Sequence, residues 1–313
     1  MSFKPVKQNF NSQIREVTIG TGEKALTLGG EQVFPFYSFD GEIKNPPCAG
    51  AEISDKGPDR NIPGIASFYA GAESIEDIAE RACSMPGARF VCLVLDSADP
   101  SGDDKSAEEC AALCKTVAEK VSLPLVIHGC GHIEKDRVML PKIAEALQGK
   151  NALLLSAKEE NYKSIAVAAV QAYGQKIGAE SSVDINLAKQ LNVLISQMGI
   201  AAGNTVMNAG TAAAGYGFEY LSSTIERIKG AALAQNDAML QFPIITPVGT
   251  DAWSVKETMV SEEDFPDWGP VEQRGINMEV TTAVAALASG SNAVSLRHPE
   301  SVAVISKLIA DLV

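Results

Sequence analysis

The sequence has few of the residues that most often carry out chemistry. Only three of its 313 residues are histidines, and no serine or cysteine stands in a recognisable nucleophile motif. An iron–sulfur cluster needs four thiolates, usually closely grouped. The six cysteines are not grouped in this way and show no disulfide-scaffold spacing. They are Cys48, Cys83, Cys92, Cys110, Cys114 and Cys130. The sequence therefore predicts neither a cluster nor a metal site held by this chain alone.

Basic clusters and long apolar runs are also missing. The chain has 26 Lys and Arg against 39 Asp and Glu, a net charge of −13. A nucleic-acid-binding protein usually shows a basic face, so no nucleic-acid partner is expected. No run approaches the roughly 18 apolar residues of a membrane span, so no membrane association is expected. The first 17 residues lack the apolar core of a signal peptide, and we expect a cytoplasmic protein.

The chain does contain a regular alternation of β-rich and helical stretches from about residue 48 onward. The clearest run, 89–96, is apolar on both faces, as a parallel strand between helices and a barrel interior must be. The other seven runs span 49–55, 124–130, 151–157, 176–182, 204–210, 242–249 and 293–298. Eight such units predict an α/β fold, a closed (βα)8 TIM barrel over residues 48–313. An open doubly wound sheet is the alternative, weakened because no G-x-G-x-x-G follows the first run.

Residues 1–47 read as a separate N-terminal extension. Two short β-rich segments, 16–20 and 26–30, flank a turn-like spacer and predict a β-hairpin. Residues 34–47 follow as an irregular arm ending in two prolines. We expect the hairpin to close the N-terminal end of the barrel.

Active sites of such barrels lie at the carboxyl ends of the strands, which form the barrel mouth. Polar or small residues follow several predicted strands, and no catalytic residue stands out among them. The candidates for the mouth are Asp96, Asn161, Asp184, Asn186, Asn208, Gly210, Thr211 and Thr246. Asp184 is equally suited to cap the helix that follows it.

Three further features have both a binding and a structural interpretation. His128-Gly-Cys-Gly-His132 has metal-ligand residue types but lacks further ligands nearby, so we expect a tight turn with His128 inside the barrel. The loop 208–217 is small, uncharged and glycine-rich, which lets a flat ligand or another backbone approach, or makes it a lid. Trp253 and Trp268 indicate either a binding surface on the rim or packing within their own loop.

With these strand ends laid out, the chain resembles a known family, the small barrel-forming subunit of the corrinoid iron–sulfur protein, a delta-type subunit of the acetyl-CoA decarbonylase/synthase system. Eight segments carry the resemblance and span nearly the whole chain in the expected order. They are FDGEI (39–43), LVLDSADP (93–100), HGCGHIEKD (128–136), ENYKS (160–164), DINLAKQLNVLI (184–195), GYGFEYLSSTIERIKGAAL (215–233), TPVGTDAWSVKE (246–257) and LRHPE (296–300).

The resemblance implies a methyl-carrier subunit in a heterodimer. A larger partner subunit would hold a [4Fe–4S] cluster and a cobalamin-type corrinoid, and the barrel mouth would cover the corrinoid's reactive face. Methyl groups would come from methyltetrahydrofolate through a methyltransferase and go to acetyl-CoA synthase, in the reductive acetyl-CoA (Wood–Ljungdahl) pathway. The eight mouth candidates thereby become candidates for corrinoid contact. The sequence is consistent with a corrinoid held by the partner, because this chain has no D-x-H-x-x-G motif to ligate cobalt.

The family's barrel also resembles pterin-binding methyltransferases, which gives an alternative function. Those enzymes place Asp, Asn and Asp at the ends of strands two, four and six. Asp96 and Asn161 could fill the first two places, but Asn208 stands where an aspartate is usual. The alternative is therefore a methyltetrahydrofolate methyltransferase with an altered pterin site. An aldolase-type barrel is disfavoured, because Lys158, in a loop, is the lysine nearest to a strand end.

Overall fold

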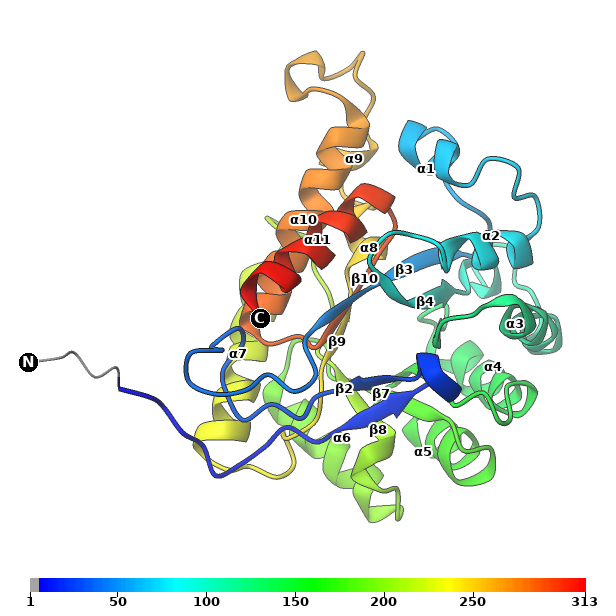
Figure 1. Cartoon of the computed structure of the whole chain (residues 1–313). Helices are drawn as coiled ribbons and strands as arrows, with labels where there is room; N and C mark the ends of the chain where they lie inside the picture. The colour runs from blue at the N-terminus through cyan, green and yellow to red at the C-terminus, as the bar shows by residue number, and fades with distance from the viewer. Residues whose placement is uncertain (1–5) are drawn as a thin grey trace, which may run out of the picture.

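Eight parallel strands form a ring surrounded by helices in the computed structural model, which describes residues 6–313 (Figure 1). The sheet runs in the order β8-β7-β6-β5-β4-β3-β10-β9. A single parallel bridge between Met207 and Ile244 joins its two ends. The strands are β3 (Cys48–Ser54), β4 (Ala88–Val94), β5 (Leu125–His128), β6 (Leu153–Ala157), β7 (Lys176–Glu180), β8 (Thr205–Asn208), β9 (Ile245–Pro247) and β10 (Ala293–Leu296). The predicted (βα)8 barrel is confirmed.

Side chains alternate between the barrel interior and the helical layer, as the period of two of a strand requires. In β3, Ala49, Ala51 and Ile53 pack in the large cluster shared with the helices. Cys48 belongs to a second cluster inside the ring. Space inside is tight, since a Cβ on Gly50 would collide with the ring of Phe90. Small residues are therefore needed where large neighbours fill the interior.

The helices lie outside the ring, between successive strands and after the last strand. They are α1 (Pro63–Phe68), α2 (Ile75–Ala82), α3 (Ala107–Lys120), α4 (Ile133–Ala146), α5 (Tyr162–Ala166), α6 (Ile185–Gln197), α7 (Phe218–Ala234), α8 (Val248–Ala252), α9 (Lys256–Met259), α10 (Val271–Ser289) and α11 (Pro299–Leu312). After α5 a π-helical stretch continues over Val167–Ala172. None of these helices, within residues 6–313, combines the length and apolar character needed to cross a bilayer.

A β-hairpin covers the N-terminal end of the ring. β1 (Val17–Ile19) pairs antiparallel with β2 (Leu26–Leu28), as predicted. Its four buried aliphatic side chains join the cluster inside the barrel. The backbone N–H of Gly20 donates to the carbonyl of Asn151, just before β6, over 2.8 Å. The hairpin therefore closes the end opposite the mouth.

A buried ion pair ties the chain just after the hairpin, before the arm, to the barrel. Lys229 on α7 lies 2.7 Å from Glu31 and donates to the side-chain oxygen of Asn292 over 3.0 Å. The amide of Asn292 donates to the same Glu31 carboxylate. Burial raises the pKa of Glu31, but the charge of Lys229 and these hydrogen bonds outweigh it, and the pKa is lowered. The pair is therefore charged and holds the segment that leads into the arm.

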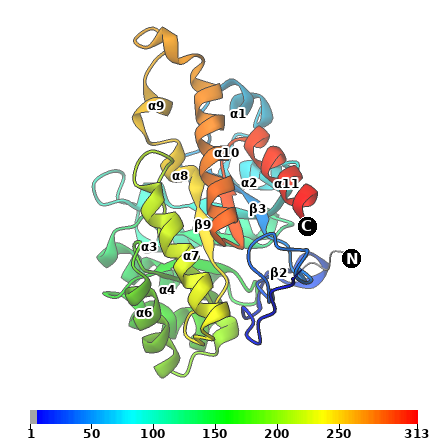
Figure 2. The ribbon, with the colours of Figure 1, turned by 90° about the vertical axis from the view of Figure 1, so that its left-hand side faces the viewer.

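Two long excursions leave the ring on the mouth side. The β3 excursion (residues 55–74) contains α1, and the β9 excursion (residues 248–270) contains α8 and α9. Figures 1 and 2 show α1 and α9 projecting on the same side of the barrel, with the loop after α9 extending furthest. The sequence indicated loops here, so these short helices were not predicted. The mouth is consequently deeper beside β3, β9 and β10 than elsewhere.

Candidate functional site

A buried ion pair occupies one side of the mouth. Glu52 of β3 faces the barrel interior, and its side chain has no exposed surface. One carboxylate oxygen accepts from Nε of Arg297 over 2.9 Å and from the hydroxyl of Thr250 over 2.9 Å. The other accepts from the hydroxyl of Ser295 over 2.6 Å. A buried charge is costly unless it is paired and hydrogen-bonded, and Glu52 is both.

A second buried carboxylate supports the turn that carries Arg297. Glu279 on α10 accepts hydrogen bonds from the backbone N–H groups of Arg297 and His298. Burial raises the pKa of Glu279 to about 7, although these hydrogen bonds oppose the shift. For Arg297 burial lowers the pKa, but the neighbouring Glu52 outweighs it and the pKa is raised. The guanidinium is therefore charged, and Arg297 is held by Glu52 at its side chain and by Glu279 at its backbone.

The other side of the mouth contains a small cavity of about 140 Å³, here called the mouth cavity. Its side-chain lining comes from several strand ends and the loops after them. Polar members are His128, Asp136, Ser156, Lys158, Glu180, Asn208, Thr211, Thr250 and Asp251. Lys158 and Glu180 form an ion pair at 3.2 Å. Burial raises the pKa of the Asp251 carboxyl.

The His128–His132 segment is a turn folded around one carboxylate. Asp136 accepts from the backbone N–H groups of Cys130 and Gly131, and a Cβ at Gly129 would collide with it. His132 accepts from Lys135 as the N-cap of α4. Nδ1 of His128 lies 3.0 Å from the carbonyl oxygen of Gly129, as expected for an interior histidine with a partner. Within residues 6–313 no three His, Cys, Asp or Glu side chains gather as metal ligands.

Four of the predicted mouth residues lie at the mouth. Asn208 is 2% exposed, donates to the hydroxyl of Ser156 over 3.0 Å and accepts from the N–H of Gly210. Gly210, at φ 91°, and Thr211 line the mouth cavity beside it. Asp96, just after β4, accepts a hydrogen bond from the hydroxyl of Ser54 over 2.5 Å. Its negative charge also helps to raise the pKa of Arg297. The glycine-rich loop therefore does contribute to the mouth.

The other four make hydrogen bonds within the fold. Asp184 is the N-cap of α6 and accepts from the N–H of Asn186, which is exposed on the first turn. Asn161 is buried, accepts from the N–H of Lys158 and donates to a backbone carbonyl. Thr246 has no exposed surface and shares a 2.6 Å hydrogen bond with Ser291, ahead of β10. These placements bring neither Asn161 nor Thr246 into the mouth cavity.

The pterin alternative needs three side chains that face one ligand. Of Asp96, Asn161 and Asn208, only Asn208 lines the mouth cavity. Both polar atoms of the Asn161 amide already bond backbone groups. The three residues therefore do not converge.

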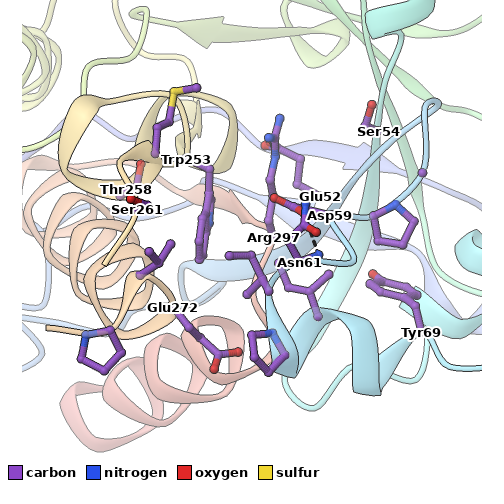
Figure 3. A pocket seen from close by; sticks show the side chains of 18 of the residues that line it. Glu52, Ser54, Asp59, Asn61, Tyr69, Trp253, Thr258, Ser261, Glu272 and Arg297 are labelled. Atoms are coloured by element: carbon purple, nitrogen blue, oxygen red, sulfur yellow. Dashed lines mark hydrogen bonds and ion pairs between the residues drawn. The ribbon is translucent and has the colours of Figure 1, made fainter. Parts of the chain in front are cut away.

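A larger cleft of about 780 Å³ opens between the two excursions (Figure 3). Glu52 and Arg297 form its inner end, Tyr69 lies on one wall and Trp253 on the other. Trp253 also stacks on His298, with 6.1 Å between ring centroids. Trp268 packs on Phe265 within its own excursion and is 39% exposed. Trp268 therefore packs within its own loop, whereas Trp253 packs on His298 after β10 and faces the cleft.

The sequence did not single out Glu52 or Glu279. Glu52 lies within a run of small and apolar residues, and its two-residue spacing from Ser54 places both on the interior face. An acidic residue on that face, together with Arg297 after the last strand, was the available signal. Glu279 sits in mid-helix and offered no comparable signal.

Comparison with known proteins gives consistent relatives. The family model for the CO dehydrogenase/acetyl-CoA synthase delta subunit matches residues 16–289. The acetyl-CoA decarbonylase/synthase complex subunit delta of Archaeoglobus fulgidus is 33% identical over 99% of this chain and 71% of its own length. Subunit delta of Methanothermobacter thermautotrophicus is 31% identical over 98% of this chain and 77% of its own length.

Solved structures share the architecture at low identity. Dihydropteroate synthase of Xanthomonas albilineans, with 4-aminobenzoic acid, has a TM-score of 0.57 at 12% identity over 95% of this chain and 98% of that one. The Yersinia pestis enzyme, with a pterine–sulfa conjugate, has a TM-score of 0.56 at 11% identity, with the same coverages. This likeness shows the barrel fold alone. The full-length sequence matches show more, and the chain belongs to the CO dehydrogenase/acetyl-CoA synthase delta subunit family, as the resemblance predicted.

Proposed function

We propose that this chain is the small subunit of a heterodimeric corrinoid iron–sulfur methyl carrier. Its mouth covers one face of a cobalamin-type corrinoid that the larger partner subunit holds, together with a [4Fe–4S] cluster. Methyl arrives from methyltetrahydrofolate through a transiently bound methyltransferase and leaves to acetyl-CoA synthase, in the cytoplasm. The supporting observation is a small cavity at the strand ends, lined by the internally paired Lys158 and Glu180 and bordered by an uncharged glycine-rich loop.

The size of the mouth fits a covering role. A cavity of about 140 Å³ is too small to enclose a macrocycle, so it suits a flat cofactor laid across the opening. The glycine-rich loop has no charge, and at Gly210 the backbone is in the left-handed region that favours glycine. A planar group can therefore approach this loop closely.

The chemistry of the mouth also fits a covering role. A bound corrinoid supplies a cobalt centre that accepts and donates methyl, while the protein controls access and orientation. The thiol of Cys130, near the mouth, has its pKa raised to about 12 by burial and by Asp136. Burial likewise raises the pKa of Asp251. The thiol nearest the opening is therefore protonated at neutral pH and does not compete for methyl.

The first experiment tests the cofactor and its location. The chain is purified alone and with its partner subunit, and cobalt is measured by elemental analysis together with the corrinoid absorbance. Cobalt stoichiometric with the heterodimer, and absent from the lone chain, is the expected result. A stable heterodimer without cobalt contradicts the proposal.

A second experiment tests the mouth itself. Asn208→Trp and Thr211→Trp each fill the mouth cavity and should slow methyl transfer by about 100-fold, since a displacement of about 1 Å can cost that much. Gln148→Trp, exposed beyond α4 at the opposite end, is the control and should transfer normally. Circular dichroism must first show that each variant is folded. Normal transfer in both folded mouth variants removes this cavity from the corrinoid site.

Calorimetry of the lone chain with methyltetrahydrofolate separates this function from the pterin alternative. We expect no binding, because the Asp96, Asn161 and Asn208 side chains do not share a cavity. Saturable binding that Asn208→Ala abolishes would favour the methyltransferase instead.

A further inference from the structure

The 780 Å³ cleft between the two excursions contains hydrogen-bond donors without acceptors. Tyr69 lines the cleft and is 1% exposed, and its hydroxyl has no partner within residues 6–313. The indole N–H of Trp253, on the facing wall, is likewise unpaired. A buried polar group without a partner destabilises the fold. The two side chains lie on opposite sides of the cleft (Figure 3), and a ligand between them could supply acceptors.

Arg297 adds a third set of donors at the inner end. Its guanidinium donates through Nε to Glu52 and through Nη2 to Thr250. It has five N–H groups, so others remain without an acceptor among the described residues. Glu52 neutralises its charge, and Asp96 and Glu279 lie close enough to raise its pKa. Because the inner end has no net positive charge, it suits a neutral acceptor such as an amide carbonyl better than an anion.

The walls and the rim have different chemistry from the inner end. Ile62 and Ile65 of the β3 excursion and Val271 at the start of α10 also line the cleft, so its walls carry apolar surface. At the rim, Asp59, Glu262 and Glu263 are exposed, and Arg297 is the only Lys or Arg among the lining residues. The rim is therefore negative and suits a cation.

A basic polypeptide segment matches all three zones at once. Its backbone carbonyls meet the inner donors, its apolar side chains meet the walls, and its lysines or arginines meet the rim. We propose that the cleft is the docking site for an extended basic segment of the larger partner subunit. The inference rests on the proposed function, which supplies that partner. A neutral amide-bearing small molecule would satisfy the inner donors but leave the rim carboxylates unmatched.

Charge reversal at the rim tests the proposal. Binding of the partner subunit is measured by calorimetry to the full chain and to Glu263→Lys, which leaves the bond from Val271 to Glu262 in place. The matched control, Glu119→Lys, makes the same change of charge on the exposed face of α3. We expect binding about 5-fold weaker for the rim variant at low salt, less at high salt, and under twofold weaker for the control. Equal weakening by both variants means that only overall charge matters and overturns the docking site.

Tyr69→Phe tests the inner end. Removing an unpaired buried hydroxyl should raise the melting temperature of the lone chain while weakening partner binding by about 2–10-fold, the loss of one hydrogen bond. Unchanged partner affinity overturns the inner contact. Binding of free cobinamide to the lone chain, lost in Tyr69→Phe, would show that a small amide-bearing molecule occupies the cleft and would also overturn it.

The two proposals fail in different ways. A wild-type heterodimer without cobalt, but with the rim and Tyr69 effects intact, removes the carrier function and leaves the docking site. A cobalt-containing heterodimer whose affinity neither variant changes removes the docking site alone.

Discussion

Replacing Glu52 by glutamine tests whether the ion pair at the mouth stabilises the barrel. Removing one partner of a buried ion pair costs about 3–5 kcal/mol. The cost should be smaller here, because the Arg297 side chain is 26% exposed and water can solvate part of its charge. The glutamine oxygen can also still accept from Arg297 and Thr250. We therefore expect a loss of about 2 kcal/mol, roughly a 30-fold fall in the folding equilibrium constant.

Urea unfolding followed by circular dichroism and by tryptophan fluorescence gives the free energy of unfolding, provided that the two transitions coincide. Glu52→Gln, Arg297→Gln and the double variant complete a cycle, in which we expect a coupling energy of about 1–2 kcal/mol. Glu108→Gln is the control, because its partner Lys142 lies on the surface. That substitution should cost under about 0.5 kcal/mol.

Two results would refute this reasoning. A loss below about 0.5 kcal/mol in Glu52→Gln would mean that the pair contributes no more than a surface pair. Additive single effects, with no coupling, would mean that Arg297 is held by the turn and by Glu279 rather than by Glu52.

Three further predictions concern other buried groups. Because the folded pKa of Glu279 is raised to about 7, its ionisation costs stability as pH rises from about 4.5 through 7, and the cost persists above 7. Glu279→Gln should therefore gain about 2.5 kcal/mol relative to the parent between pH 5 and pH 8 in urea unfolding, and a flat difference contradicts this. Lys229→Met leaves the Glu31 carboxylate buried without its cation and should cost about 3–5 kcal/mol, largely recovered by adding Glu31→Gln. Gly50→Ala puts a methyl group against Phe90 and should lower stability by about 1–3 kcal/mol in the same assay, whereas an unchanged midpoint would show that the ring can move.

The barrel could be predicted because each unit repeats the same physical requirements. A strand buried on both faces has a short apolar sequence, and a helix follows it within a few residues. All eight predicted runs overlap observed strands, with ends displaced by at most a few residues. The helices α1, α8 and α9 were missed because they have four to six residues and no sustained apolar period.

The site was predicted less well because a polar residue after a strand has two possible roles. In a βα unit the same short loop ends the strand and begins the helix, and a helix start needs a polar N-cap wherever it points. Asp184, His132 and His298 all cap helices. Asn208 could be placed at the mouth because a long small-residue loop, rather than a helix start, follows it directly. A polar residue at a strand end therefore predicts a mouth residue best where a long loop separates it from the next helix.

A charged residue inside a strand gives evidence about the fold that a polar residue at a strand end does not. Glu52 and Arg297 are 245 residues apart and meet only because β3 pairs with β10 as the ring closes. That junction has four paired positions, whereas a single bridge joins β8 to β9. An acidic residue inside the first barrel strand and an arginine after the last strand therefore indicate together that these two strands pair and close the barrel. The ion pair also fixes Arg297 at the inner end of the cleft before any partner arrives, so little entropy is lost in ordering this donor on binding.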